Sequence, residues 1–127
     1  MVKITDKIQL KIALKSLRYK TNDIEGCSIV TRNGLVIESE LLADVENKTF
    51  AALSADITKS GEIAASELKI GKLSQIIINT PKGSIITTNI GKKAILVCLV
   101  QKKANLGLVI LHMTRTAERL SRLINWG

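Results

Sequence analysis

One run of the sequence, residues 94–100, is apolar at all seven positions: Ala-Ile-Leu-Val-Cys-Leu-Val. Seven residues are too few to cross a bilayer, which takes about 20 residues of helix. A strand with one solvated face alternates apolar and polar residues, whereas a continuous apolar run is typical of a strand that is covered on both faces. We therefore expect a layered fold, in which a sheet has at least one helix on each side.

Turn residues and apolar periodicity divide the 127-residue chain into a single series of elements. We predict helices over residues 6–20, 46–68 and 105–125, and strands over residues 26–32, 35–40, 73–80, 84–89 and 94–101. The pair Asn33-Gly34 suits a two-residue type I′ turn, because both central positions of that turn need a positive φ. We expect one domain, residues 1–127, of mixed α and β class.

The first helix carries two apolar stripes. Leu10, Ala13, Leu14 and Leu17 share one face and are predicted to pack in the core. A second stripe consists of Ile4, Ile8, Ile12 and Tyr19. Its simpler interpretation is contact with a neighbouring helix. The alternative is a partner or membrane surface, since apolar residues flanked by lysine suit anionic lipid.

The second helix is predicted to begin after an N-cap at Asp44 and to stop at Lys69 and Gly71. We assign one face to the sheet: Phe50, Leu53, Ile57, Gly61, Ala64 and Leu68. The outward face would then hold Ala52, Ala55, Asp56, Lys59, Glu62, Ile63 and Ser66. Small residues on that outward face would let another backbone approach closely.

The third helix is predicted to face the core with Leu106, Ile110, Met113, Ala117, Leu120 and Ile124. Arg115, Arg119 and Arg122 lie on the opposite side, and we interpret this arginine row as a solvated face.

The formal net charge of +8 is unevenly distributed along the chain. Residues 1–20 carry +5, residues 21–68 carry −6 and residues 69–127 carry +9. Such segregation predicts faces of opposite potential in the folded protein, and these influence the choice of partner more than the fold.

No recognisable catalytic or cofactor-binding motif is present in the sequence. His112 is the only histidine, and with Cys27 and Cys98 it cannot supply a zinc site at any usual spacing. Neither Gly71-Lys72 nor Gly91-Lys92 has the flanking residues of a phosphate-binding loop. We therefore expect a protein that is not an enzyme and binds no cofactor. The N-terminus lacks a secretory h-region, so we expect a cytoplasmic protein whose two cysteines are reduced core residues.

The ordered set of these features resembles the roadblock family, also called the dynein light chain roadblock type. The resemblance runs from Leu10 to Ile124. It is carried by Leu10, Leu14 and Leu17 before residues 24–30, by Asn33-Gly34-Leu35-Val36, by the small-residue segment 50–55 and by residues 105–109. The resemblance implies a profilin- and longin-like fold with a five-stranded antiparallel sheet. The first and third helices would cover one face of that sheet, and the second helix the other.

The resemblance also implies a homodimer that forms through the strand 73–80 and the helix 46–68. The strand has no charged residue to protect a free edge, which independently favours strand pairing. The predicted dimer interface consists of Gln75, Ile76, Ile77, Ile78, Asn79, Ala55 and Lys59.

The partner that the resemblance implies is a small Ras-like GTPase. The expected partner-binding residues are Ala52, Asp56, Glu62, Ile63 and Ser66. Together these features favour a non-catalytic homodimeric regulator or scaffold that modulates the nucleotide cycle of the GTPase. The alternative is a basic adaptor for nucleic acid or an anionic membrane. Such an adaptor would bind through Lys7, Lys11, Lys15, Arg18, Arg115, Arg119 and Arg122.

Overall fold

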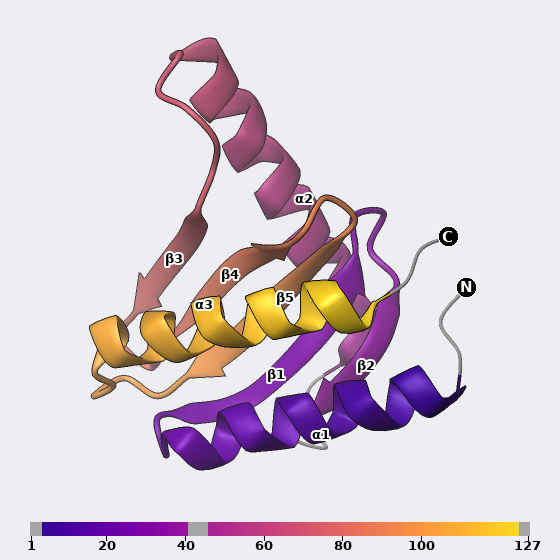
Figure 1. The fold of residues 1–127 in the computed structure, drawn as a ribbon. Helices are drawn as coiled ribbons and strands as arrows, with labels where there is room; N and C mark the ends of the chain where they lie inside the picture. Colours follow the sequence, from indigo (N-terminus) through magenta and orange to yellow (C-terminus); the bar gives the residue numbers. More distant parts are fainter. Residues whose placement is uncertain (1–3, 41–45, 125–127) are drawn as a thin grey trace.

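The computed structural model describes residues 4–40 and 46–124. Its elements follow one another as α1 (Ile4–Lys20), β1 (Ile24–Thr31), β2 (Val36–Glu40), α2 (Asn47–Glu67), β3 (Gln75–Thr80), β4 (Gly83–Ile90), β5 (Ala94–Val100) and α3 (Leu106–Leu123) (Figure 1). The predicted order of elements is confirmed, and no element end differs from its predicted position by more than two residues.

The five strands form one antiparallel sheet in the order β2-β1-β5-β4-β3. The apolar run forms β5, the middle strand, and all of its residues except Leu99 are buried. The prediction that this strand is covered on both faces is therefore confirmed. The strands β2 and β3 are the two edges of the sheet.

The helices lie on both faces of the sheet as expected, with α1 and α3 on one face and α2 on the other (Figure 1). Alternate residues of β5 supply the two cores. Leu96, Cys98 and Val100 belong to the larger core under α1 and α3. Ile95 and Val97 belong to the smaller core under α2.

Helix α2 packs on the sheet through small side chains. Its predicted facing is wrong for Leu53, Ala64 and Leu68, which are exposed, whereas Phe50 packs against the smaller core as predicted. The buried residues of α2 are Ala51, Ser54, Ala55, Thr58 and Ala65. By contrast, Leu53 is 55% exposed and Leu68 is 68% exposed. Small side chains let the helix axis approach the sheet closely, so the larger apolar residues are turned to one side. Ala55, which was expected to point outward, is buried beside Val30 and Val97.

The hairpin turn between β1 and β2 spans three residues, so the two-residue type I′ turn is wrong. The Gly34 N–H donates to the Thr31 carbonyl at 3.0 Å, and the Thr31 N–H donates to the Leu35 carbonyl at 2.8 Å. Gly34 has φ +89°, whereas Asn33 does not have a positive φ. This is a type I turn closed by a glycine bulge, in which only the glycine needs the left-handed conformation.

Side chains and backbone geometry set the helix ends. Glu46 is the N-cap of α2 and accepts from the Lys48 N–H at 2.9 Å, while the predicted cap Asp44 lies outside the described residues. The predicted stop is confirmed, since Lys69 and Gly71 adopt φ of 54° and 103° directly after the helix. Asn105 caps α3 by accepting from the Leu108 N–H at 3.1 Å.

The second apolar stripe of α1 is exposed and is not covered by another helix of the described residues. Ile8 is 58% exposed, Ile12 is 53% exposed and Tyr19 is 86% exposed. The side chain of Ile4 lies outside the described part of the chain. The simpler interpretation of this stripe is therefore wrong for its described side chains. The arginines of α3 are exposed, as predicted.

Candidate interaction surface on helix α2 and strand β3

Strand β3 has a free, uncharged edge. Among the described strands it pairs only with β4, in a register that runs from Gln75 opposite Thr88 to Thr80 opposite Gly83. Ile77 is 40% exposed, and no residue of β3 is charged. The outer backbone groups of such a strand are a template for another strand.

A row of apolar residues on α2 continues this edge. We call it the α2 stripe, and it consists of Leu53, Ile57, Ala64 and Leu68. Gly61 lies on the same side of the helix, because residues three and four apart share a helical face. A Cβ at Gly61 would lie 2.8 Å from Ile76 Cδ1 and 3.3 Å from Leu73 Cδ2. The stripe therefore lies on the β3 side of α2 and comes closest to β3 at Gly61.

The predicted dimer residues fall into two groups in the structure. The five residues 75–79 lie on the free edge, as expected. Ala55 is only 5% exposed and lies under the helix. Lys59 is exposed but lines a shallow hollow with Glu62 and Ile63, on the side of α2 away from the stripe. The stripe could not be recognised from the sequence, because apolar periodicity assigns these residues to the sheet.

The predicted partner-binding residues lie along the other side of α2. Ala52, Asp56, Ile63 and Ser66 are exposed, and Ile63 is 56% exposed. Glu62 is half-buried and forms an ion pair with Arg32. Its charge is therefore already neutralised within the chain, and the face is less acidic than expected.

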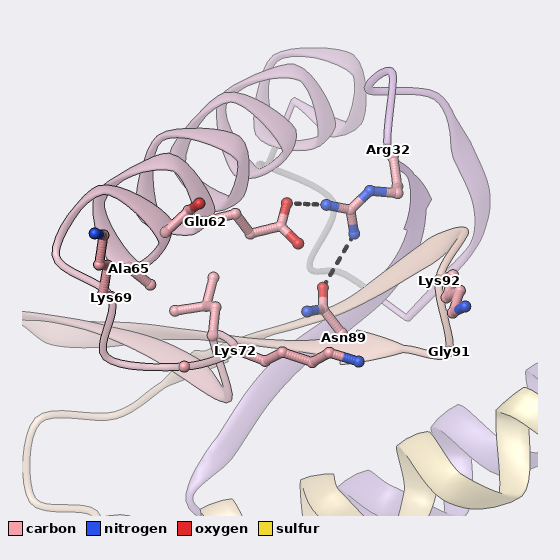
Figure 2. A pocket seen from close by; sticks show the side chains of 11 residues that line it. Arg32, Glu62, Ala65, Lys69, Lys72, Asn89, Gly91 and Lys92 are labelled. Atoms are coloured by element: carbon pink, nitrogen blue, oxygen red, sulfur yellow. Dashed lines mark hydrogen bonds and ion pairs between the residues drawn. The ribbon is translucent and has the colours of Figure 1, made fainter.

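A cleft of about 850 Å³ opens between the C-terminal half of α2 and the end of the sheet (Figure 2). Glu62 and Ser66 line it together with Ala65, Lys69, Gly71, Lys72, Leu73, Asn89, Gly91, Lys92 and Arg32. Four of these side chains are basic and one is acidic. The cleft therefore has a positive potential beside the predicted partner-binding face.

Arg32 links three elements at this cleft. Figure 2 shows its guanidinium between Glu62 of α2 and Asn89 of β4. The Arg32 Nη1 donates to Asn89 Oδ1 at 3.3 Å. No arginine is predicted at this surface from the sequence, because α2 itself has none. The sequence feature that indicates a role for Arg32 at this cleft is its position in the β1–β2 turn, because a side chain in this turn extends beyond the end of the sheet.

The described residues contain no group of three or more histidine, cysteine, aspartate or glutamate side chains that could hold a metal ion. In the same part of the chain, no helix combines the length and apolar character that a membrane crossing requires. The features that distinguish this surface are thus a strand edge, an apolar stripe and a basic cleft.

Comparison with known proteins gives consistent matches. The family model described as Roadblock/LC7 domain matches residues 13–100. The protein MJ1340 of Methanocaldococcus jannaschii is 34% identical over 104 residues, which cover 82% of this chain and 90% of that protein.

Solved structures share the fold at lower identity. MglB in a tetrameric arrangement has a TM-score of 0.87 at 20% identity, covering 97% of this chain and 93% of that one. The gliding protein MglB of Thermus thermophilus has a TM-score of 0.86 at 20% identity, with the same coverage. Profilin II of Acanthamoeba castellanii has a TM-score of 0.63 at 14% identity and covers 89% of this chain and 97% of its own, which confirms the profilin-like fold class.

Proposed function

Because the chain belongs to the Roadblock/LC7 family, we propose that it is a non-catalytic homodimeric regulator or scaffold that binds a small Ras-like GTPase. The fold alone does not determine activity, since one fold hosts many functions. The partner class comes from the family resemblance, and the surfaces come from the geometry.

The observation that carries this proposal is that the free β3 edge and the exposed α2 stripe lie on the same side of the molecule. A second copy of β3 would extend the sheet and pair backbone groups that otherwise depend on water. A second α2 would cover Leu53 and Leu68, which are both more than half exposed. One solved MglB structure of this fold is described as having a tetrameric arrangement, which supports self-association as part of the proposal.

The GTPase is proposed to dock on the opposite side of α2, where Asp56 and Ile63 are exposed. The basic cleft next to this side suits an acidic segment of the partner. Dimerisation through the stripe would leave this side of the helix free. The two interactions can therefore occur together.

Stimulation of GTP hydrolysis by this chain would be indirect. Arg32 is the one arginine that lines the cleft, and Glu62 and Asn89 hold it in place. Removing a true arginine finger reduces hydrolysis by about 10³-fold or more. We expect Arg32→Ala to reduce the stimulated rate of GTP hydrolysis far less than this, because the protein would act by biasing the switch loops of the GTPase. Single-turnover hydrolysis with the wild type and the variant distinguishes the two mechanisms.

Two matched variants of α2 test the assignment of the two sides. Leu53→Glu and Ile63→Glu place the same charge at positions that are 55% and 56% exposed. We expect Leu53→Glu to lower the mass measured by light scattering from dimer to monomer. We expect Ile63→Glu to leave the dimer intact and to weaken capture of a GTPase from native extract supplemented with a GTP or GDP analogue.

The outcomes separate the two parts of the proposal. A wild-type monomer at high micromolar concentration would disprove the homodimer. A dimer whose captured proteins include no GTPase with either nucleotide would disprove the partner class. If Ile63→Glu breaks the dimer and Leu53→Glu does not, the two sides of α2 are assigned the wrong way round.

A further inference from the structure

The outer surfaces of α1 and α3 expose apolar side chains that neither the core nor the proposed dimer uses. Ile8, Ile12 and Tyr19 of α1 are each more than half exposed. On α3, Leu108 and Leu111 are 40% and 43% exposed. All five side chains lie on the sides of the two helices that face away from the sheet.

The two helices lie side by side and antiparallel, so these side chains share one face of the molecule (Figure 1). Asp23, just after α1, accepts from the Asn105 N–H at 2.9 Å and from Gln101 Nε2 at 2.7 Å. These bonds hold the end of α1 beside the start of α3. Leu108 and Leu111 are therefore near the Tyr19 end of α1, and the arginines of α3 are near the Ile8 end.

The charge of this face is strongly positive. Lys11 and Arg18 form ion pairs with Glu38 and Glu40, and so contribute little. The exposed basic residues of α1 and α3 are Lys7, Lys15, Lys20, Arg115, Arg119 and Arg122. Among the exposed residues of these two helices, the acidic one is Glu118. The outer α1/α3 face, which consists of these exposed apolar and basic side chains, therefore combines the two characters.

The positive charge and the exposed apolar side chains of this face together indicate which kind of partner it binds. A second copy in a symmetric contact would place basic side chains opposite basic side chains. A nucleic-acid backbone would match the charge but would leave the isoleucines and leucines without a partner. An anionic lipid surface satisfies both, because its headgroups attract lysine and arginine while apolar side chains enter the interface.

We propose that the outer α1/α3 face docks on an anionic membrane surface. The proposal is independent of the GTPase, since it uses the face of the molecule opposite α2. Docking in this orientation leaves the α2 stripe, the β3 edge and the basic cleft accessible. The protein could therefore dimerise and bind a partner while it lies on the membrane.

Vesicle co-sedimentation of the purified full chain tests this proposal. The probes are vesicles of phosphatidylcholine alone and vesicles with about one-third phosphatidylserine. Each basic residue near such a surface is worth about 1 kcal/mol, or about fivefold in partitioning. We expect binding only to the anionic vesicles, and we expect it to fall steeply as salt is raised.

Matched variants distinguish the face from the net charge. Arg119→Glu and Lys59→Glu change the charge equally, on opposite faces of the protein. We expect Arg119→Glu to weaken vesicle binding by about tenfold or more and Lys59→Glu to leave it nearly unchanged. Ile12→Ser should also weaken binding, whereas Ile63→Ser, at a site of similar exposure on α2, should not. Circular dichroism melting checks that all four variants are folded.

Three results would overturn the proposal. The first is no binding to anionic vesicles at low salt. The second is equal loss of binding with Lys59→Glu and Arg119→Glu. The third is duplex DNA binding that is tighter than vesicle binding at matched salt and is unaffected by Ile12→Ser, which would assign the face to nucleic acid.

Discussion

At the scale of single residues, the charged side chains of the edge strand β2 form ion pairs with α1. Lys11 Nζ lies 2.8 Å from Glu40 Oε1, and Arg18 Nη1 lies 3.4 Å from Glu40 Oε2. The Glu40 side chain is only 15% exposed. The hydrogen bond from Lys11 lowers the pKa of Glu40 and outweighs the opposing effect of burial. This pair holds α1 against the edge strand β2.

This arrangement predicts how stability depends on pH. A carboxyl group whose pKa is lower in the folded state stabilises the fold above its unfolded pKa, and this contribution is lost as the pH falls through the folded pKa. We expect Glu40→Gln to lower the free energy of unfolding at pH 7 by about 1 kcal/mol. The difference from the wild type should shrink as the pH is lowered below about 4, the usual range of a glutamate pKa.

Denaturant unfolding at a series of pH values measures this difference. Glu25→Gln is the control, because Glu25 is exposed on β1 and has no ion pair within the described residues. A stability difference for Glu40→Gln that stays constant with pH would contradict the assigned role of the carboxylate.

Gly34 provides a second residue-level prediction. It has φ +89°, and a Cβ there would lie 3.2 Å from the backbone Cα of Ala52 in α2. We expect Gly34→Ala to destabilise the protein by about 1–2 kcal/mol, from backbone strain and from pushing the turn away from α2. Gly71→Ala is matched for strain, with φ +103° and no atom within 4 Å of the added Cβ. We expect Gly71→Ala to lower the free energy of unfolding in urea by less than Gly34→Ala does. Equal decreases would mean that the contact with Ala52 is unimportant.

At the scale of elements, the pairing of β1 with β5 places the two cysteines in register. Cys27 lies opposite Cys98, and both are free and buried. The Cys27 thiol donates to the Leu14 carbonyl at 3.6 Å, and burial raises the pKa of the Cys98 thiol. Both residues are therefore small core residues, as the sequence analysis predicted. The Cys27 thiol joins the sheet to α1 instead of facing solvent.

We expect both thiols to react slowly with a thiol reagent in the native protein and rapidly after unfolding, because a buried neutral thiol is a poor nucleophile. The melting temperature should be the same with and without reductant. A melting temperature that changes when reductant is added would show that the cysteines have a redox role.

Strand β3 gives the second prediction at this scale. Ile77→Pro removes a backbone donor from the middle of the free edge, so we expect it to weaken self-association. The dissociation of the dimer on dilution, followed by light scattering, measures the effect. Ile77→Val, which keeps the donor and the β-branched side chain, is the control. Equal dissociation of the two variants would exclude β3 from the dimer contact.

At the scale of the whole molecule, the sheet separates two surfaces of different character. The α2 side combines an apolar stripe, an uncharged strand edge and a basic cleft, and we propose it for protein partners. The outer α1/α3 face combines exposed apolar and basic side chains, and we propose it for lipid. This division places the two proposed interactions on opposite sides of one sheet, so they do not compete.

The sequence by itself determined the order of elements and the central place of residues 94–100. It also determined the core faces of α1 and α3, where Leu10, Leu14, Met113 and Leu120 are buried as predicted. These features depend on apolar periodicity and on turn residues, which are local properties of the chain. These features can be predicted from the sequence where the apolar face of an element is buried within the same chain.

The tertiary structure alone decided the rotation of α2, the outward direction of Ile12 and the link from Arg32 to Glu62. Periodicity finds an apolar side of a helix but does not show whether the sheet or something outside the chain covers it. In α2 the small residues fit the sheet, and the larger Leu53 and Leu68 stay outside. Arg32 and Glu62 are 30 residues apart, so only the packing of α2 over the β1–β2 turn brings them together.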